Sequence, residues 1–242
     1  MLRSLLTCCF WLAGMVSVPA AAHAQGGNVF GPTVRAGDRT AEWRVLAVIG
    51  SDGGWTRATR LHYQHAFNDA LRLRGVVQAV AESGESWDAD FARAELLWQY
   101  REQTPSGYQA AFRFDARLNA QGAHRFAANW VQQWDFSEDW RLRAILLADH
   151  EVGAGAGSGV RLRHRARLSR RFGERLNAGI ETFGRFGNLA DGLPSFDAQR
   201  HSAGPALFGD FNARWRWHAT SQWALTRAAD DTPLRVQIYR RF

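Results

Sequence analysis

The sequence predicts an all-β fold, a single antiparallel transmembrane β-barrel of twelve strands. From residue 40 onward side chains alternate between apolar and polar, aromatic residues gather near the ends of the alternating segments, and the connections are alternately short and long. Successive side chains of a strand point to opposite faces, so the alternation gives each strand one apolar and one polar face. Ten strands is the alternative, if the first segment and one later segment do not span.

Residues 1–24 have the pattern of a cleaved signal peptide. Arg3 gives a positive start, residues 5–18 are apolar or small, and Ala-His-Ala at residues 22–24 fits the rule for cleavage before Gln25. The alternative is an N-terminal membrane anchor, but the apolar run is shorter than the roughly 20 residues that a spanning helix needs. The sequence therefore predicts export.

Charge and cysteine content exclude several classes of protein. All 30 basic residues are arginine, and the formal net charge is +7. Both cysteines, Cys8 and Cys9, precede the predicted cleavage site, so the exported part has neither a disulfide framework nor a thiolate metal site. Export also argues against a nucleic-acid partner. Residues 25–39 carry no strong pattern and are predicted as a periplasmic lead-in to a barrel of residues 40–242.

The alternation is clearest in residues 160–168, where every odd position is arginine and the even positions are mostly apolar. As a helix this segment would scatter arginine around its circumference. Most of the alternating segments reach the 9–11 residues that a tilted membrane-spanning strand needs, and their even number is typical of bacterial barrels. The twelve segments are residues 40–49, 55–67, 70–81, 89–102, 107–119, 123–135, 139–150, 159–171, 174–185, 200–210, 213–226 and 233–242.

The connections and the aromatic residues support the barrel independently. Every second connection is short, whereas residues 83–88, 153–159 and 186–199 form longer ones. Membrane barrels combine short periplasmic turns with longer external loops, and they carry aromatic girdles at both interfaces. The alternative, a soluble β-sandwich, would not need aromatic residues at its strand ends. The loop of residues 186–199 is either a constriction over the lumen or an ordinary surface loop.

The C-terminal strand carries a more specific pattern. Residues 234–238 read Leu-Arg-Val-Gln-Ile, and the chain ends at Phe242. This resembles the last strand of Gram-negative outer-membrane β-barrel proteins, which ends in an aromatic residue read by the barrel-assembly machinery. Arg240 departs from that pattern, because the place third from the end is usually apolar or aromatic. The resemblance implies an outer-membrane location, contact with lipid and lipopolysaccharide, and Phe242 as the C-terminal assembly signal.

The polar faces predict an arginine-rich lumen. An arginine on the lipid face near the midplane costs about 2–4 kcal/mol, so a long series of them belongs in a wet or paired interior. Rings of arginine favour anions, which predicts a passive channel for small or anionic solutes. The architecture is similar to that of twelve-stranded porins for acidic oligosaccharides, such as the oligogalacturonate-specific channels. The predicted pore-lining residues are Arg113, Arg117, Arg161, Arg163, Arg165, Arg167, Arg214 and Arg216.

Two other functions remain open. In the first, the arginines pair with Glu95, Asp115 and Glu181, and the barrel is a non-conducting structural or polysaccharide-export accessory protein. In the second, it is a lipid-modifying or proteolytic enzyme with its site at the rim. The chain lacks the His-x-Ser spacing of barrel hydrolases, and Asp149-His150-Glu151 is only a weak local cluster. No catalytic residue, metal site or cofactor is predicted.

Overall fold

The computed structural model describes residues 28–49 and 54–242, most of which form β-strands. The predicted signal peptide lies outside these residues. No helix in the described part of the chain is long and apolar enough to cross a membrane. The strands are β1 (Arg39–Ile49), β2 (Trp55–Ala66), β3 (Leu71–Glu82), β4 (Asp88–Arg101), β5 (Tyr108–Asn119), β6 (His124–Asp135), β7 (Trp140–Val152), β8 (Val160–Phe172), β9 (Leu176–Asn188), β10 (Arg200–Asp210), β11 (Trp215–Ala224) and β12 (Thr232–Arg241), with two short 3₁₀ helices, η1 (Leu189–Asp191) and η2 (Phe196–Ala198).

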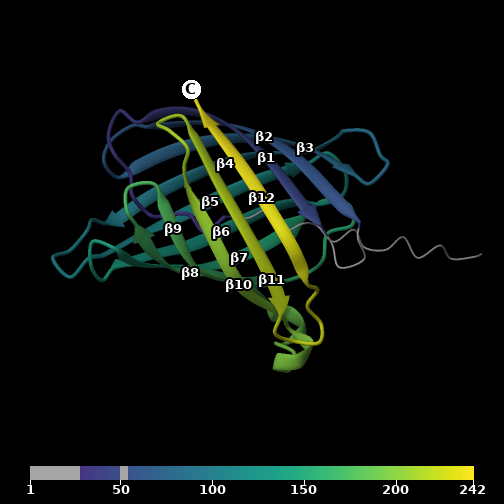
Figure 1. Cartoon of the computed structure of the whole chain (residues 1–242). Coiled ribbons are helices and arrows are strands. Elements are labelled where there is room, and N and C mark those ends of the chain that lie inside the picture. The colour runs from purple at the N-terminus through teal and green to yellow at the C-terminus, as the bar shows by residue number, and fades with distance from the viewer. Residues whose placement is uncertain (1–27, 50–53) are drawn as a thin grey trace, which may run out of the picture.

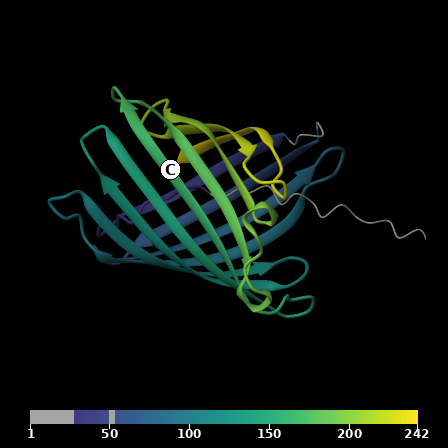
Figure 2. The same cartoon turned by 90° about the horizontal axis from the view of Figure 1, so that it is seen from below.

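The twelve strands form one closed antiparallel barrel, in which each strand pairs with its neighbours in sequence (Figures 1 and 2). β1 and β12 close it along a seam that runs from the pair Glu42–Arg241 to the pair Ile49–Leu234. Closure leaves no free sheet edge. The predicted fold class and the count of twelve strands are confirmed, and the predicted strand ends differ from the observed ones by at most three residues.

The two ends of the barrel differ. The even-numbered strands from β2 to β10 are joined to the next strand by short turns at one end, which we call the turn end, where β1 also begins and β12 ends. The opposite end, which we call the loop end, carries the connections that include residues 153–159 and 189–199. The connection with η1 and η2 protrudes there beside the β11–β12 loop (Figure 1). If the turn end is periplasmic, this matches the usual construction of such barrels.

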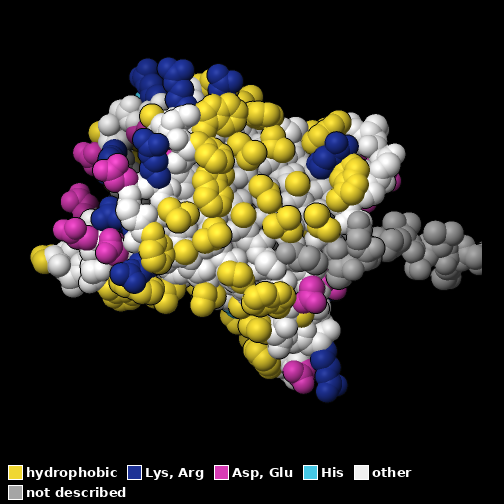
Figure 3. Space-filling model, viewed as in Figure 1, with side chains coloured by type: hydrophobic (Ala, Val, Ile, Leu, Met, Phe, Trp, Pro, Cys, Tyr) yellow, Lys and Arg dark blue, Asp and Glu magenta, His cyan; other side chains and the backbone are white. Residues whose placement is uncertain are grey.

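The outer wall is apolar. Leu61, Val77 and Ile180 point outward and are more than half exposed. Figure 3 shows hydrophobic side chains spread over the broad strand-covered face, with charged side chains gathered toward its edges. Exposed aromatic residues mark both ends: Trp98, Trp140 and Phe172 at the turn end, and Trp87, Phe126 and Trp223 at the loop end. An apolar belt between two aromatic girdles is the surface of a barrel that spans a membrane.

The first described residues lie inside the barrel. Val29 and Val34 are almost fully buried and belong to the same apolar cluster as Leu97, Val131 and Ile145, which point inward from the wall. We call residues 28–34 the lumen segment. The sequence predicts residues 25–39 as a periplasmic lead-in, and residues 28–34 of this range lie within the barrel. The short sequence of the segment has no alternation that could reveal an interior position.

Candidate functional site

The inner wall is charged, and its arginines outnumber its acids. The burial pattern alternates most clearly along β4, β6 and β7, and the ion-paired side chains lie at inward positions. The inward acids are Glu42, Asp90, Glu95, Asp115, Asp135, Asp149, Glu151, Glu181 and Asp210, and the inward arginines are Arg44, Arg60, Arg72, Arg74, Arg93, Arg113, Arg117, Arg125, Arg141, Arg143, Arg161, Arg163, Arg165, Arg167, Arg185, Arg216, Arg235 and Arg241.

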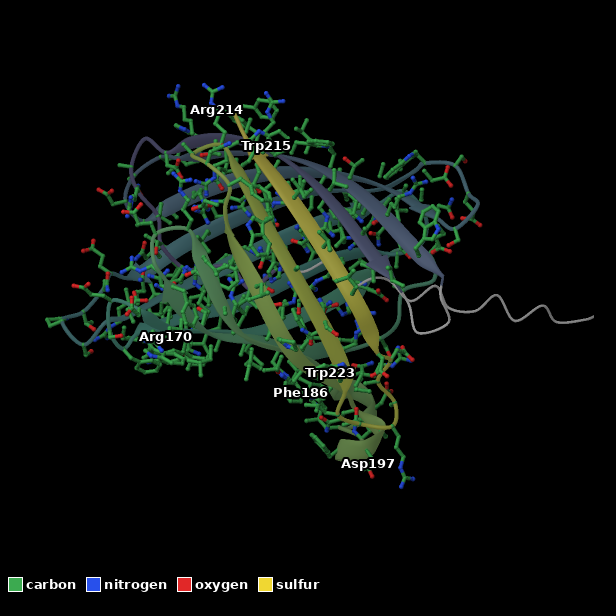
Figure 4. All side chains as sticks on the ribbon, viewed as in Figure 1. Arg170, Phe186, Asp197, Arg214, Trp215 and Trp223 are labelled. Carbon is green, nitrogen blue, oxygen red and sulfur yellow. The ribbon has the colours of Figure 1, made fainter. Side chains whose placement is uncertain are left out.

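The structure places seven of the eight predicted pore-lining arginines on this inner face. Arg214 is the exception: it lies in the exposed turn between β10 and β11, where Figure 4 shows it at the turn end next to Trp215. The alternation around residue 215 predicts a strand that begins at residue 213, but β11 begins at Trp215. Arg214 therefore has no lumen position.

A first ion-pair cluster lies midway along β4 and β5, around Glu95. The carboxylate of Glu95 is 3 % exposed and lies 2.5 Å from Arg93, 3.5 Å from Arg74 and 3.5 Å from Arg113. Arg113 also contacts Asp115 at 2.7 Å. A carboxylate buried this deeply needs such partners, because an unpaired buried charge is strongly destabilising. The Glu95 cluster thus fixes the arginines of this wall.

A second cluster lies near the loop end, around Asp149. Its fully buried carboxylate contacts Arg161 at 2.7 Å and Arg125 at 3.4 Å, and also pairs with Arg163. Glu151, the next inward residue of β7, contacts Arg161 at 2.7 Å and Arg125 at 3.2 Å. Two acids and three arginines leave a net positive charge at this level.

A third cluster lies on the other side of the lumen, around Glu181. The carboxylate is fully buried and lies 3.0 Å from Arg235, 3.1 Å from Arg167 and 3.2 Å from Nε2 of His218. Glu181 is the predicted partner acid that the structure brings together with arginines from β8 and β12. In all three clusters the acids and most of the arginines form ion pairs. Such pairing is expected of the alternative, a non-conducting structural or accessory barrel.

Several inward arginines form no ion pair with an acid among the residues that the structure describes, and Arg165 and Arg185 are two of them. Arg165 is the next inward residue beyond Arg167 toward the loop end, and Arg185 lies opposite Arg163 on β9. The largest electrostatic interactions of both guanidinium groups are with other arginines. This part of the lumen therefore has uncompensated positive charge, which attracts carboxylate and phosphate groups.

The lumen segment is bound to the wall at several points. At its C-terminal end the backbone N–H of Val34 donates to Gln99 at 2.7 Å, and the hydroxyl of Thr33 donates to Gln109 at 2.9 Å. These glutamines lie near the turn end of β4 and β5. The segment thus enters from the turn end.

The other end of the segment reaches the middle of the barrel. Nη2 of Arg167 donates to the carbonyl oxygen of Val29 at 2.6 Å, and the guanidinium of Arg113 stacks on the ring of Phe30 at 3.8 Å. Asn28 donates to the hydroxyl of Tyr239 at 3.0 Å. Residues 28–34 therefore cross the lumen from β4 and β5 to β8 and β12.

Apolar residues at inward positions of the wall indicate that something apolar lies in the lumen, although the alternation of side chains does not reveal what it is. Leu97, Val131, Ile145 and Leu147 are inward positions that break the polar character of the inner face. Apolar side chains on the inner wall gain no free energy if they face water. A patch of them inside a barrel therefore indicates an apolar occupant that packs against it. Val29 and Val34 are that occupant.

The structure does not assemble the weak rim cluster of Asp149, His150 and Glu151. Asp149 and Glu151 point inward and are paired with arginines, whereas His150 points outward and Nδ1 of its ring lies 2.7 Å from the carbonyl oxygen of Gly159. His201 and Ser202 also lie on opposite faces of β10. These side chains do not form an acid–base–nucleophile arrangement.

The closed barrel and its apolar outer belt define the class: a transmembrane β-barrel. Solved structures with the same architecture are porins and channels. The chain is similar to the COG4313 outer membrane channel from Pseudomonas putida F1, with a TM-score of 0.60, 12% identity, and coverage of 89% of this chain and 99% of that chain.

Two further structures show the same fold. The KdgM porin in complex with disordered oligogalacturonate has a TM-score of 0.56 and 13% identity, over 84% of this chain and 99% of that chain. The NanC porin has a TM-score of 0.57 and 7% identity, over 85% of this chain and 100% of that chain. No protein-family model and no curated protein matches the sequence. At these identities the likeness is one of fold.

Proposed function

We propose that this barrel is a passive outer-membrane channel for small anionic solutes, held closed by its own lumen segment. The observation that carries the proposal is the excess of inward arginine, with Arg165 and Arg185 lacking an acidic partner among the described residues. Fixed positive charge in a low-dielectric wall lowers the energy of an anion and raises that of a cation. Carboxylate and phosphate groups also match the forked donors of arginine.

The fold supports the proposal, since its structural neighbours are porins and channels. The KdgM porin was solved with oligogalacturonate, a chain of carboxylated sugars. In this proposal the lumen segment closes the pore: its bonds to Gln99 and Arg167 hold it across the lumen, and Arg165 and Arg185 lie toward the loop end from Arg167.

Conductance in a planar lipid bilayer tests the proposal. The intact barrel should conduct rarely, and a variant without residues 28–34 should conduct steadily with a reversal potential that shows anion preference. Arg165→Gln combined with Arg185→Gln in that open variant should move the permeability ratio toward one. Arg57→Gln combined with Arg170→Gln is the matched control, because Arg57 lies against Trp55 and Arg170 against Trp140 on the outer wall, so two charges are lost outside the lumen.

The non-conducting accessory barrel is the second candidate, and the dense pairing around Glu95, Asp149 and Glu181 favours it. Absence of conductance in both the intact barrel and the variant without residues 28–34, with folding verified for both, would select this candidate. A cation preference in the open variant would show that the barrel is a channel but would contradict its proposed preference for anionic solutes.

A further inference from the structure

Two histidines meet on the outer wall, away from the lumen. His164 of β8 and His201 of β10 both pair across the sheet with Gly184 of β9, so they flank the same residue from either side. Their ring centroids are 5.3 Å apart. Both side chains point outward, since their sequence neighbours Arg163 and Ser202 face the interior. The channel proposal gives this pair no role.

Gly184 provides the space between the rings. A Cβ atom at this position would lie 2.1 Å from Cε1 and 2.4 Å from Nδ1 of His164, and 2.3 Å from Nδ1 of His201, so the edges of both rings pack over the glycine. The two ring nitrogens therefore converge on one small volume above the glycine. Metal–nitrogen bonds to histidine are about 2.0–2.1 Å long, so one ion beside the glycine is the kind of ligand that two such nitrogens can share. Any side chain at residue 184 would fill the volume instead.

The second nitrogen of each ring is held by an oxygen atom. Nε2 of His201 lies 2.7 Å from Oε1 of Gln199, and Nε2 of His164 lies 2.8 Å from the hydroxyl of Thr182. The amide of Gln199 is fixed in this orientation because its nitrogen donates to the carbonyl oxygen of Pro194 at 2.9 Å. An amide oxygen only accepts, so Nε2 of His201 carries the proton and Nδ1 presents a lone pair.

His164 fits the same arrangement. The hydroxyl of Thr182 accepts equally well, which leaves Nδ1 of His164 with its lone pair. That nitrogen is buried and has no hydrogen-bond partner among the described residues. Histidines that bind metals are held by a second hydrogen bond of this kind, which sets the tautomer and the ring orientation.

Aromatic rings enclose the pair. Phe196 of η2 stacks on His201 with ring centroids 5.0 Å apart, and Phe186 lies 5.1 Å from His164. Figure 4 shows Phe186 and Asp197, the neighbour of Phe196, at the same end of the barrel. At Phe196 the loop thus packs on the outer wall and does not form a constriction over the lumen.

We propose that His164 and His201 form a site for a divalent transition metal ion, with their Nδ1 atoms as ligands and water in the remaining positions. Imidazole suits Zn²⁺, Ni²⁺ and Cu²⁺, and of these Cu²⁺ binds nitrogen ligands most tightly. No group of three or more potential ligands occurs among the described residues, so the site offers two protein ligands. The ion joins β8 to β10 across β9 and anchors the loop through Phe196.

Titration of the folded, detergent-solubilised barrel with Cu²⁺, followed by calorimetry and electron paramagnetic resonance, tests the site. The intact protein should bind one Cu²⁺ with a two-nitrogen spectrum, which His164→Gln and His201→Gln should each abolish. Thr182→Val keeps both ligands and should weaken binding about 10–100-fold. His65→Gln is the matched control, since His65 lies on the outer face of β2 near the turn end and should bind as the intact protein does.

A second measurement uses stability. Zn²⁺ at a concentration above its dissociation constant should raise the unfolding temperature of the intact barrel and leave that of the His164→Gln, His201→Gln double variant unchanged. Heat-modifiable migration in gels verifies that each variant has folded. Equal Cu²⁺ binding by the intact protein and the double variant overturns the proposal, as does a spectrum with a single nitrogen ligand.

Discussion

Nη2 of Arg167 donates to the carbonyl oxygen of Val29 at 2.6 Å, while Nη1 of the same guanidinium lies 3.1 Å from Glu181. One side chain therefore binds both the ionic network of the wall and the backbone that fills the lumen. Arginine is suited to this because its donors form a planar fork that can serve two acceptors at once.

Replacing Arg167 should open the lumen. In Arg167→Met the bond to Val29 is lost, and Glu181 keeps Arg235 at 3.0 Å, so the barrel still folds. We expect longer and more frequent open events in single-channel recordings. Arg141→Met is the control, because Arg141 is a half-exposed arginine near the turn end that pairs with Asp135 and has no bond to the segment. Equal opening in both variants would contradict the role of Arg167.

The inward apolar residues that pack against the lumen segment should contribute to the stability of the barrel. Ile145 is 1 % exposed inside the barrel, so Ile145→Ala leaves a cavity and should lower the free energy of unfolding by about 2–5 kcal/mol. Ile180→Ala removes the same atoms from the lipid-facing wall, where lipid replaces them, and should cost less. Urea titration in lipid vesicles compares the two. Similar losses would mean that nothing packs on Ile145 within the lumen.

A charge on the outer belt should impair folding into lipid. Val77 lies near the middle of β3 and points outward, so Val77→Arg should cost about 2–4 kcal/mol. Leu193→Arg places the same side chain in the exposed loop between η1 and η2 and should have little effect. The folded fraction in vesicles measures the difference. Normal folding of Val77→Arg would mean that this face does not meet hydrocarbon.

The C-terminal aromatic residue is proposed as an assembly signal. Phe242→Ala should lower the yield of folded barrel in cells, while purified protein refolded in detergent keeps its stability, because the residue is two-thirds exposed. Phe211→Ala removes an equally exposed ring at the same end and should assemble normally. If the two variants assemble to the same extent in cells, the side chain of Phe242 carries no signal.

The strands are predictable because period-two alternation is a local property that each segment carries by itself. In β8 every odd residue from Arg161 to Arg167 faces inward, as the sequence alone indicates. Boundaries are less certain, since the alternation fades at turns. That uncertainty is enough to misplace Arg214, which lies one residue before β11.

The contents of the lumen depend on contacts distant in sequence, which alternation does not encode. Val29 meets Arg167 across 138 residues. The meeting of His164 and His201 at Gly184 likewise depends on the registers of two strand pairs, and β8–β9 shifts its register between Leu162 and Arg163. Strand registers depend on the closure of the whole barrel, so they cannot be predicted from each segment of the sequence by itself.

The seam between β1 and β12 sets an order of events in biogenesis. Glu42 near the start of β1 pairs with Arg241 near the end of β12, so the barrel closes only when its first and last strands meet. Residues 28–34 are made before any strand, yet they end up enclosed. The lumen segment must therefore enter the interior before β12 pairs with β1, or while that pairing forms.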